Sequence, residues 1–172
     1  MQEKLILKTT KQTLSTERNL QKRVSQKGSD MKVFSQFPGL EALNAMTLGN
    51  MGEILAIEFT EHTEEKLVAR MPVFENTKQP FGLLHGGASV ALAETVASIA
   101  ANLALDPAEN AYAVGLEINA NHIKAVTSGF VVATCRPLQL GSKISVWDIR
   151  IANEAGTLVC ISRMTAAILK RK

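Results

Sequence analysis

Reactive and metal-binding side chains are scarce in this chain of 172 residues. It has two cysteines, Cys135 and Cys160, too few for a disulfide scaffold, and they form no CxxC pair of the kind used by zinc knuckles and redox motifs. Its three histidines follow no HExxH pattern or other ligand spacing. The sequence therefore predicts no metal site and no bound cofactor.

Aromatic residues are also few, at 5%, and the positive charge is unevenly placed. Residues 1–30 contain seven Lys/Arg and three Asp/Glu, which gives a net charge of +4. The rest of the chain contains 12 Lys/Arg and 13 Asp/Glu, which gives a net charge of −1. Nucleic-acid surfaces combine a basic stripe with interleaved aromatic side chains, and the body of this chain has no such stripe. We therefore predict no nucleic-acid partner.

The sequence predicts a polar, basic leader over residues 1–34 and one domain over residues 35–172. We interpret the leader as a tail, or as the product of a gene start assigned too early, with Met31 as the initiator. The alternative is a targeting segment. Glu3 and Glu17 weigh against a transit peptide, and no apolar stretch of signal-peptide type is present. With two free cysteines and no signal, a cytoplasmic location is predicted.

The pattern of the domain predicts one long helix and several strands. A short helix is expected at residues 40–46, strands at 53–59 and 66–71, the long helix at 88–105, and four strands at 111–123, 130–137, 144–153 and 157–169. Because one helix cannot cover both faces of a parallel sheet, the predicted fold is α+β, with an antiparallel sheet wrapped around the long helix.

The long helix is apolar but is not expected to cross a membrane. It is rich in alanine and contains polar residues such as Ser89, Glu94 and Asn102, whereas a spanning helix needs about 20 strongly apolar residues. Its small side chains would let a sheet approach closely. We therefore predict a buried helix and no membrane partner.

Glu94 is the only charged residue in this helix. A lone carboxylate on an apolar helix is costly unless it is hydrogen-bonded or protonated, which suits general acid–base chemistry. Glu94, Ser98 and Asn102 recur at every fourth position and therefore line one side of the helix. The alternative is a structural role in which backbone amides, or a Ser or Thr at a subunit seam, hold the carboxylate.

The residues before the helix suggest a place for an oxyanion. Gly86 and Gly87 open the helix, where unpaired amides carry partial positive charge and can stabilise a reacting carbonyl. His85 either contributes here or caps the helix, and Gln79 either donates its amide or is a solvated loop residue. Glu94 lies roughly 10 Å further along the axis, so a second subunit could unite the groups.

The segment 78–95, KQPFGLLHGGASVALAET, strongly resembles the hotdog-fold acyl-CoA thioesterases. It is most similar to the phenylacetic-acid-degradation-type branch, near 1,4-dihydroxy-2-naphthoyl-CoA thioesterase of menaquinone synthesis and the Arthrobacter-type 4-hydroxybenzoyl-CoA thioesterase. The resemblance continues through residues 40–46, 114–122 and 135–142, and covers about residues 38–169.

This resemblance implies roles for five residues. Glu94 matches the catalytic carboxylate, which acts as nucleophile or as base on water, and Gly86 matches the amide that polarises the thioester carbonyl. Gln79 and His85 match groups that bind this oxygen or the water, and Ser98 matches a residue that assists the water or the acyl group. The family pairs Gln79, His85 and Gly86 of one subunit with Glu94 and Ser98 of another, which implies a homodimer or homotetramer.

The resemblance also implies how an acyl-CoA is bound. CoA is expected near the turn at residues 140–142, where Ser142, Lys143 and Arg163 are candidate phosphate contacts, with a solvated face as the alternative. His122 is a candidate for the acyl pocket, with a surface position as the alternative. The implied reaction is hydrolysis of an aromatic acyl-CoA, such as 1,4-dihydroxy-2-naphthoyl-CoA, to the free acid and CoA.

Two rival functions use the same fold. Acyl-thioester dehydratases also pair a helix carboxylate with a loop histidine, but their His-Phe-x-x-x-Pro-x-x-Pro-Gly signature is absent here. A non-catalytic acyl-CoA-binding module would not need a charged residue at position 94. Release of free thiol from acyl-CoAs distinguishes the three.

Overall fold

The structure, a computed structural model, describes residues 32–171, so most of the predicted leader lies outside the described residues. The elements, in chain order, are α2 (Leu40–Ala45), α3 (Met51–Ile54), β1 (Glu58–His62), β2 (Leu67–Pro72), η1 (Glu75–Thr77), α4 (Gly86–Leu103), η2 (Pro107–Glu109), β3 (Ala111–His122), β4 (Phe130–Leu140), β5 (Ile144–Asn153) and β6 (Leu158–Lys170). The predicted long helix and the four strands after it are confirmed, with ends that differ by a few residues.

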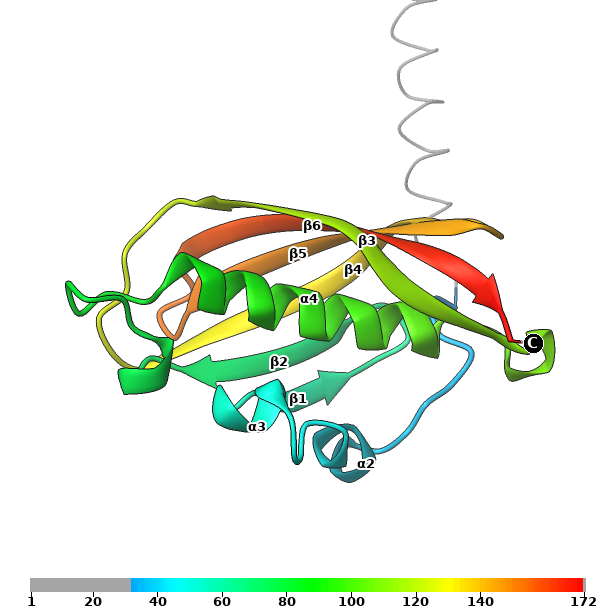
Figure 1. Cartoon of the computed structure of the whole chain (residues 1–172), viewed down its shortest axis with the longest axis horizontal. Helices are drawn as coiled ribbons and strands as arrows, with labels where there is room; N and C mark the ends of the chain where they lie inside the picture. The colour runs from blue at the N-terminus through cyan, green and yellow to red at the C-terminus, as the bar shows by residue number, and fades with distance from the viewer. Residues whose placement is uncertain (1–31, 172) are drawn as a thin grey trace, which may run out of the picture. The chain divides into compact units, whose positions relative to one another are not determined.

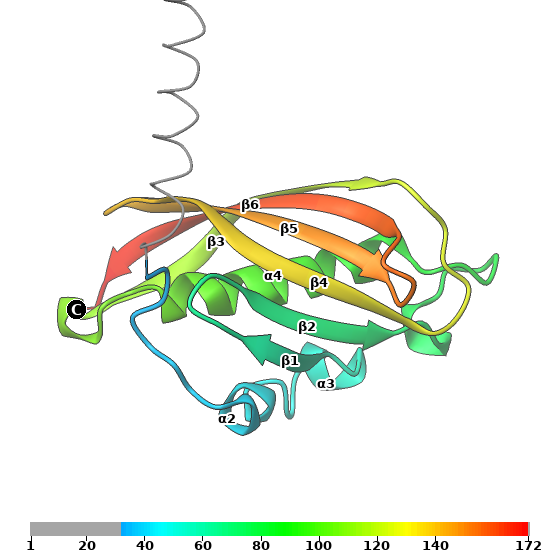
Figure 2. The ribbon, with the colours of Figure 1, turned by 180° about the vertical axis from the view of Figure 1, so that it is seen from behind.

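The strands form one six-stranded sheet in the order β1-β2-β4-β5-β6-β3. Every neighbouring pair is antiparallel. Figure 1 shows α4 lying along one face of the curved sheet, with α2 and α3 beside β1. Figure 2 shows that no helix of the described residues covers the middle of the opposite face. This is the predicted antiparallel sheet wrapped around one long helix.

The helix α4 packs closely on the sheet because the side chains on its inner side are small. Ala93, Ala97 and Ala100 are fully buried, whereas the sheet supplies large side chains such as Trp147. The indole Nε1 of Trp147 donates to Oγ of Ser145 at 2.9 Å, so the buried ring leaves no donor unpaired. Within residues 32–171, no helix has the length and apolar character that a membrane crossing needs.

The strand predicted over residues 53–59 is wrong in its first half. The structure has α3 there, and β1 begins only at Glu58. The side chain of Asn50 caps α3 by accepting from the amide of Gly52 at 2.9 Å, and the Glu53 carboxylate accepts from the amide of Gly49 at 2.6 Å. These local bonds favour a helical turn, and a short apolar run by itself does not separate helix from strand.

The packed part of the chain begins two residues before the predicted domain start at residue 35. Val33 and Phe34 are buried. The Phe34 ring lies edge-on to His62 at 4.9 Å and stacks on Trp147 at 6.2 Å between centroids. Because Phe34 fills the core at the end of the sheet, it belongs to the domain.

Candidate active site

The first turn of α4 presents one free backbone donor. Nδ1 of His85 accepts from the amide of Gly87 at 2.8 Å, and the His85 carbonyl accepts from the amides of Ala88 and Ser89. Among residues 32–171, nothing accepts from the amide of Gly86. His85 therefore caps the helix, as the structural alternative expected, and the Gly86 N–H is available to bind an anion or a carbonyl oxygen.

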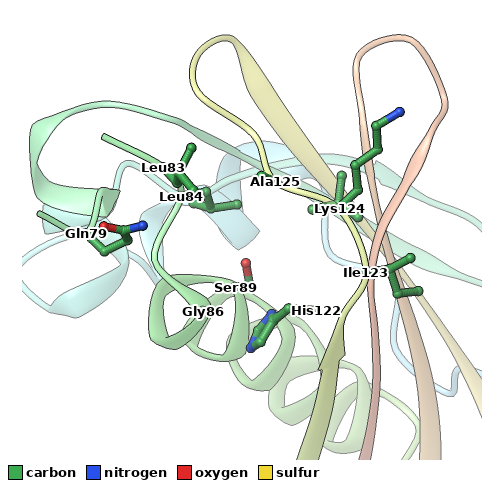
Figure 3. Close-up of a pocket in the computed structure, with 10 residues that line it drawn as sticks. Gln79, Leu83, Leu84, Gly86, Ser89, His122, Ile123, Lys124 and Ala125 are labelled. Carbon is green, nitrogen blue, oxygen red and sulfur yellow. The ribbon is translucent and has the colours of Figure 1, made fainter. Parts of the chain in front are cut away.

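A pocket of about 320 Å³ opens beside this turn (Figure 3). Half of its ten lining residues are leucine, isoleucine, alanine or valine, and polar groups gather near the start of α4. Its lining residues are Gln79, Leu83, Leu84, Gly86, Ser89, His122, Ile123, Lys124, Ala125 and Val159. An apolar hollow with a few convergent polar groups is the usual form of a small-molecule site.

Gln79 is held at this pocket by a tight loop. The backbone N–H of Gln79 donates to the Leu83 carbonyl at 2.8 Å, and the backbone carbonyl of Gln79 accepts from the amide of Gly82 at 2.9 Å. The Gln79 side-chain oxygen accepts from the amide of Phe81. The side-chain nitrogen is therefore the free end of the Gln79 amide, and Figure 3 shows it turned toward the pocket. The structure thus leaves this nitrogen free to donate, and the role of Gln79 as a donor to the carbonyl oxygen stays a prediction.

His122 lies directly against the start of α4. A methyl group placed on Gly86 would come within 2.6 Å of the His122 Nε2 atom, so the ring occupies the space where a side chain at position 86 would lie. Figure 3 shows the two residues side by side, with Lys124 extending from the rim of the pocket. Ser89 and Lys124 were missed by the sequence reasoning. The signal for Lys124 was its place two residues after His122 at the end of a strand.

Glu94 lies further along α4 and is not part of the pocket wall within the same chain. Its side chain is half-buried. Its Oε1 atom faces β3, where a methyl group placed on Gly115 would come within 2.8 Å of it. No described residue donates a hydrogen bond to the Glu94 carboxylate. Within the described residues, backbone amides therefore do not hold this carboxylate, and the alternative of a Ser or Thr at a subunit seam stays open.

The polar stripe of α4 divides into two parts. The Ser98 hydroxyl lies one turn after Glu94 and faces the Met164 sulfur at 3.7 Å. The Asn102 side chain instead accepts from the amide of Ala113 at 2.9 Å and donates to the Ala113 carbonyl at 3.0 Å. Asn102 thus joins α4 to β3, while Ser98 remains beside the carboxylate.

The predicted CoA contacts lie away from the pocket within one chain. Ser142 lines a second hollow of about 130 Å³ at the C-terminal end of α4, together with Ala101 and Leu105, and Lys143 is next to it in the β4–β5 turn. Arg163 is exposed on β6, whereas its neighbour Met164 is buried against α4, so the arginine occupies the outer face.

Neither cysteine has the character of a nucleophile. Burial raises the pKa of the Cys135 thiol, and the negative charge of Asp148 raises it further. Burial also raises the pKa of Cys160, and a backbone hydrogen bond to Asn121 offsets part of this effect. In residues 32–171, no three His, Cys, Asp or Glu side chains gather as a set that could hold a metal ion.

This architecture is that of the hotdog-fold thioesterases, in which an antiparallel sheet wraps around one long helix. The chain belongs to the thioesterase superfamily. The model of that superfamily matches residues 81–160. The predicted fold is thereby confirmed, and so is the prediction of a thioester hydrolase.

Curated relatives and solved structures support this assignment over most of the chain. The 1,4-dihydroxy-2-naphthoyl-CoA hydrolase of Escherichia coli is 53% identical over 130 residues, which are 76% of this chain and 94% of that protein. A proofreading thioesterase of Cronobacter turicensis is 47% identical over 130 residues, or 76% of this chain and 93% of that protein. A crystallised variant of a Pseudomonas aeruginosa thioesterase has a TM-score of 0.77 and 46% identity, and covers 80% of this chain and 98% of its own.

Proposed function

We propose that the protein is an acyl-CoA thioesterase that hydrolyses an aromatic acyl-CoA, with 1,4-dihydroxy-2-naphthoyl-CoA as the first substrate to test. The observation that carries this proposal is the pair of unengaged groups on α4. The Gly86 amide has no acceptor and the Glu94 carboxylate no donor among the described residues. Thioester hydrolysis needs a donor for the carbonyl oxygen and a nucleophile or base for the attack, and a free carboxylate can serve as either.

A second copy of the chain would bring these groups together. Gly86 and Glu94 are eight residues apart, about 12 Å along the helix axis. β3 is an edge strand, with Val114 37% and Leu116 62% exposed, and an exposed apolar edge is a template for strand pairing. Antiparallel pairing of β3 with its copy would set the two α4 helices side by side in opposite directions. The Gly86 end of one helix would then approach Glu94 of the partner subunit.

The chemistry follows from this placement. The carboxylate of Glu94 either attacks the thioester carbon, expelling the CoA thiolate and leaving an anhydride that water hydrolyses, or removes a proton from the attacking water. In either route, negative charge develops on the carbonyl oxygen. The Gly86 N–H, at the positive end of α4, and the Gln79 amide nitrogen stabilise that charge.

The same pairing supports the predicted CoA contacts. With the two helices antiparallel, the β4–β5 turn at the C-terminal end of one α4 would lie near the Gly86 pocket of the other. Lys143 of the partner subunit and Lys124 at the rim would then provide cations for the CoA phosphates from two sides. The aliphatic side chains of the described pocket would receive the acyl group, which suits a flat aromatic ring.

The test of the proposal is free-thiol release from 1,4-dihydroxy-2-naphthoyl-CoA, benzoyl-CoA and a mid-chain fatty acyl-CoA. Glu94→Gln keeps the shape of the side chain but removes its basicity, and turnover is expected to fall by about 10²–10⁴-fold. The matched control is Glu41→Gln, an exposed position in the first turn of α2. Near-normal turnover by folded Glu94→Gln protein would overturn the assignment, and binding without any thiol release from wild-type protein would favour a dehydratase or a binding module.

The shared site has its own test. Glu94→Gln and Gln79→Ala subunits are each expected to be nearly inactive, but a mixed dimer contains one site with both residues intact. Mixing should therefore restore part of the activity. If demonstrated mixed dimers show no recovery, each site lies within one subunit.

A further inference from the structure

The edge strand β3 contains one residue more than its partner strand requires. Gly115 pairs with Ala166 on β6, whereas Glu117 pairs with the adjacent Thr165, so Leu116 is an additional residue in a β-bulge. Bulges of this type bend the strand and redirect the side chains that follow. This one lies directly opposite Glu94 on α4.

The bulge changes which side chains of β3 face the helix. Before it, the odd-numbered positions point inward, as the buried Ala113 shows. After it, the even-numbered Ile118 and Ala120 pack on the core, and His122 reaches Gly86. Because a shift of one residue exchanges the two faces of a strand, a regular strand would point His122 away from the pocket.

Gly115 occupies the position of the bulge where the backbone meets the carboxylate. A Cβ atom at this position would lie 2.8 Å from Oε1 of Glu94 and 3.9 Å from the sulfur of Met164. Its φ does not fall in the left-handed region that favours glycine. Glycine is therefore needed at position 115 because it has no Cβ atom, and not because its backbone can adopt a positive φ.

We infer that Gly115 is a positioning residue for the Glu94 carboxylate, an inference that rests on the proposed function of Glu94. The bare backbone lets the carboxylate lie against the edge of the sheet, toward the side where the second subunit would pair. An alanine methyl group would need about 0.6 Å more space to reach an ordinary contact, and a displacement of about 1 Å at a reacting group can cost 10²-fold in rate. Gly115 would thus fix the direction of attack.

The expected result for Gly115→Ala is a fall in kcat of about tenfold or more with little change in KM, because the group that moves acts on the reacting carbon. The matched control is Gly39→Ala, where a new Cβ has no neighbour within 4 Å and φ is −65°. That variant should keep wild-type kinetics.

A second background separates positioning from a general effect on the fold. Glu94→Asp withdraws the carboxylate by one methylene group, which removes the oxygen from the path of the new methyl. In this background, Gly115→Ala should lower the remaining kcat by less than about twofold. An equal loss in both backgrounds, or no loss in either, would overturn the inference.

Folding and the proposed function are checked separately. If Gly115→Ala does not fold, the double variant Gly115→Ala/Glu94→Ala decides, because it lacks the oxygen that the methyl would meet. Recovery of a cooperative melting transition supports the contact, and an unfolded double variant refutes it.

Normal turnover by Glu94→Gln would reject the proposed function itself, whereas an inactive Glu94→Gln beside a fully active Gly115→Ala would reject only the role of Gly115.

Discussion

Replacing Asn102 with alanine should destabilise the domain without disabling the chemistry. The Asn102 side chain holds the amide and the carbonyl of Ala113 at 2.9 and 3.0 Å, and it also donates to the Ser98 carbonyl at 2.9 Å. Ala113 is only 8% exposed. The substitution therefore removes both side-chain links between α4 and β3 and leaves peptide groups of Ala113 with fewer partners.

The size of the effect follows from these bonds. The net contribution of one hydrogen bond to the free energy of unfolding is about 1 kcal/mol, and a buried polar group left unpaired lowers that free energy by about 1–3 kcal/mol. The expected loss in free energy of unfolding is therefore about 2–4 kcal/mol. At about 3 °C for each kcal/mol in a domain of this size, Tm should fall by roughly 6–12 °C.

Thermal and urea unfolding measure this loss, with Asn76→Ala, an exposed position in η1, as the matched control. Turnover is measured well below the melting transition, where Asn102→Ala should keep its kcat. An unchanged Tm would refute the proposed link between helix and strand. A loss of kcat as large as that of Glu94→Gln in fully folded protein would show that the polar stripe of α4 acts as one catalytic unit.

Three further predictions follow from the described chain. Because burial raises the pKa of Cys135 and Cys160, both should react slowly with a thiol reagent at pH 8 and rapidly in denaturant; fast native labelling would contradict this. Lys124→Ala and Lys143→Ala should each raise KM for an acyl-CoA several-fold with kcat unchanged, and neither should affect an N-acetylcysteamine thioester that lacks the nucleotide. Equal losses with both substrates would argue against phosphate contacts. Shortening the chain to remove the fully buried Phe34 should lower stability by about 3–5 kcal/mol, whereas a truncation that starts at Met31 and keeps both Val33 and Phe34 should not change Tm.

The elements that the sequence predicted correctly have strong local signals. The long helix has an alanine-rich run bounded by two glycines at one end, and the last hairpin has a turn in which the Gly156 amide donates to the Asn153 carbonyl at 2.9 Å. Glu94 became a candidate because a single charge in an apolar helix is conspicuous. The short helix α3 was missed because the capping bonds of Asn50 compete with an apolar run that also suits a strand.

The role of Gly115 had no comparable signal, because it depends on pairing between distant segments. The strand over residues 111–123 was predicted, but the run Val114-Gly115-Leu116-Glu117-Ile118 does not show where its register slips against β6. Only the strand pairing in the folded sheet shows that the register shift lies opposite Glu94. Because the same slip turns His122 toward Gly86, one additional residue in an edge strand serves both ends of the site, while the exposed Leu116 remains on the edge where a second subunit would pair. Removal of the additional residue, which would abolish the bulge, should therefore affect attack, oxyanion binding and assembly together, whereas Gly115→Ala keeps the bulge and should affect attack alone.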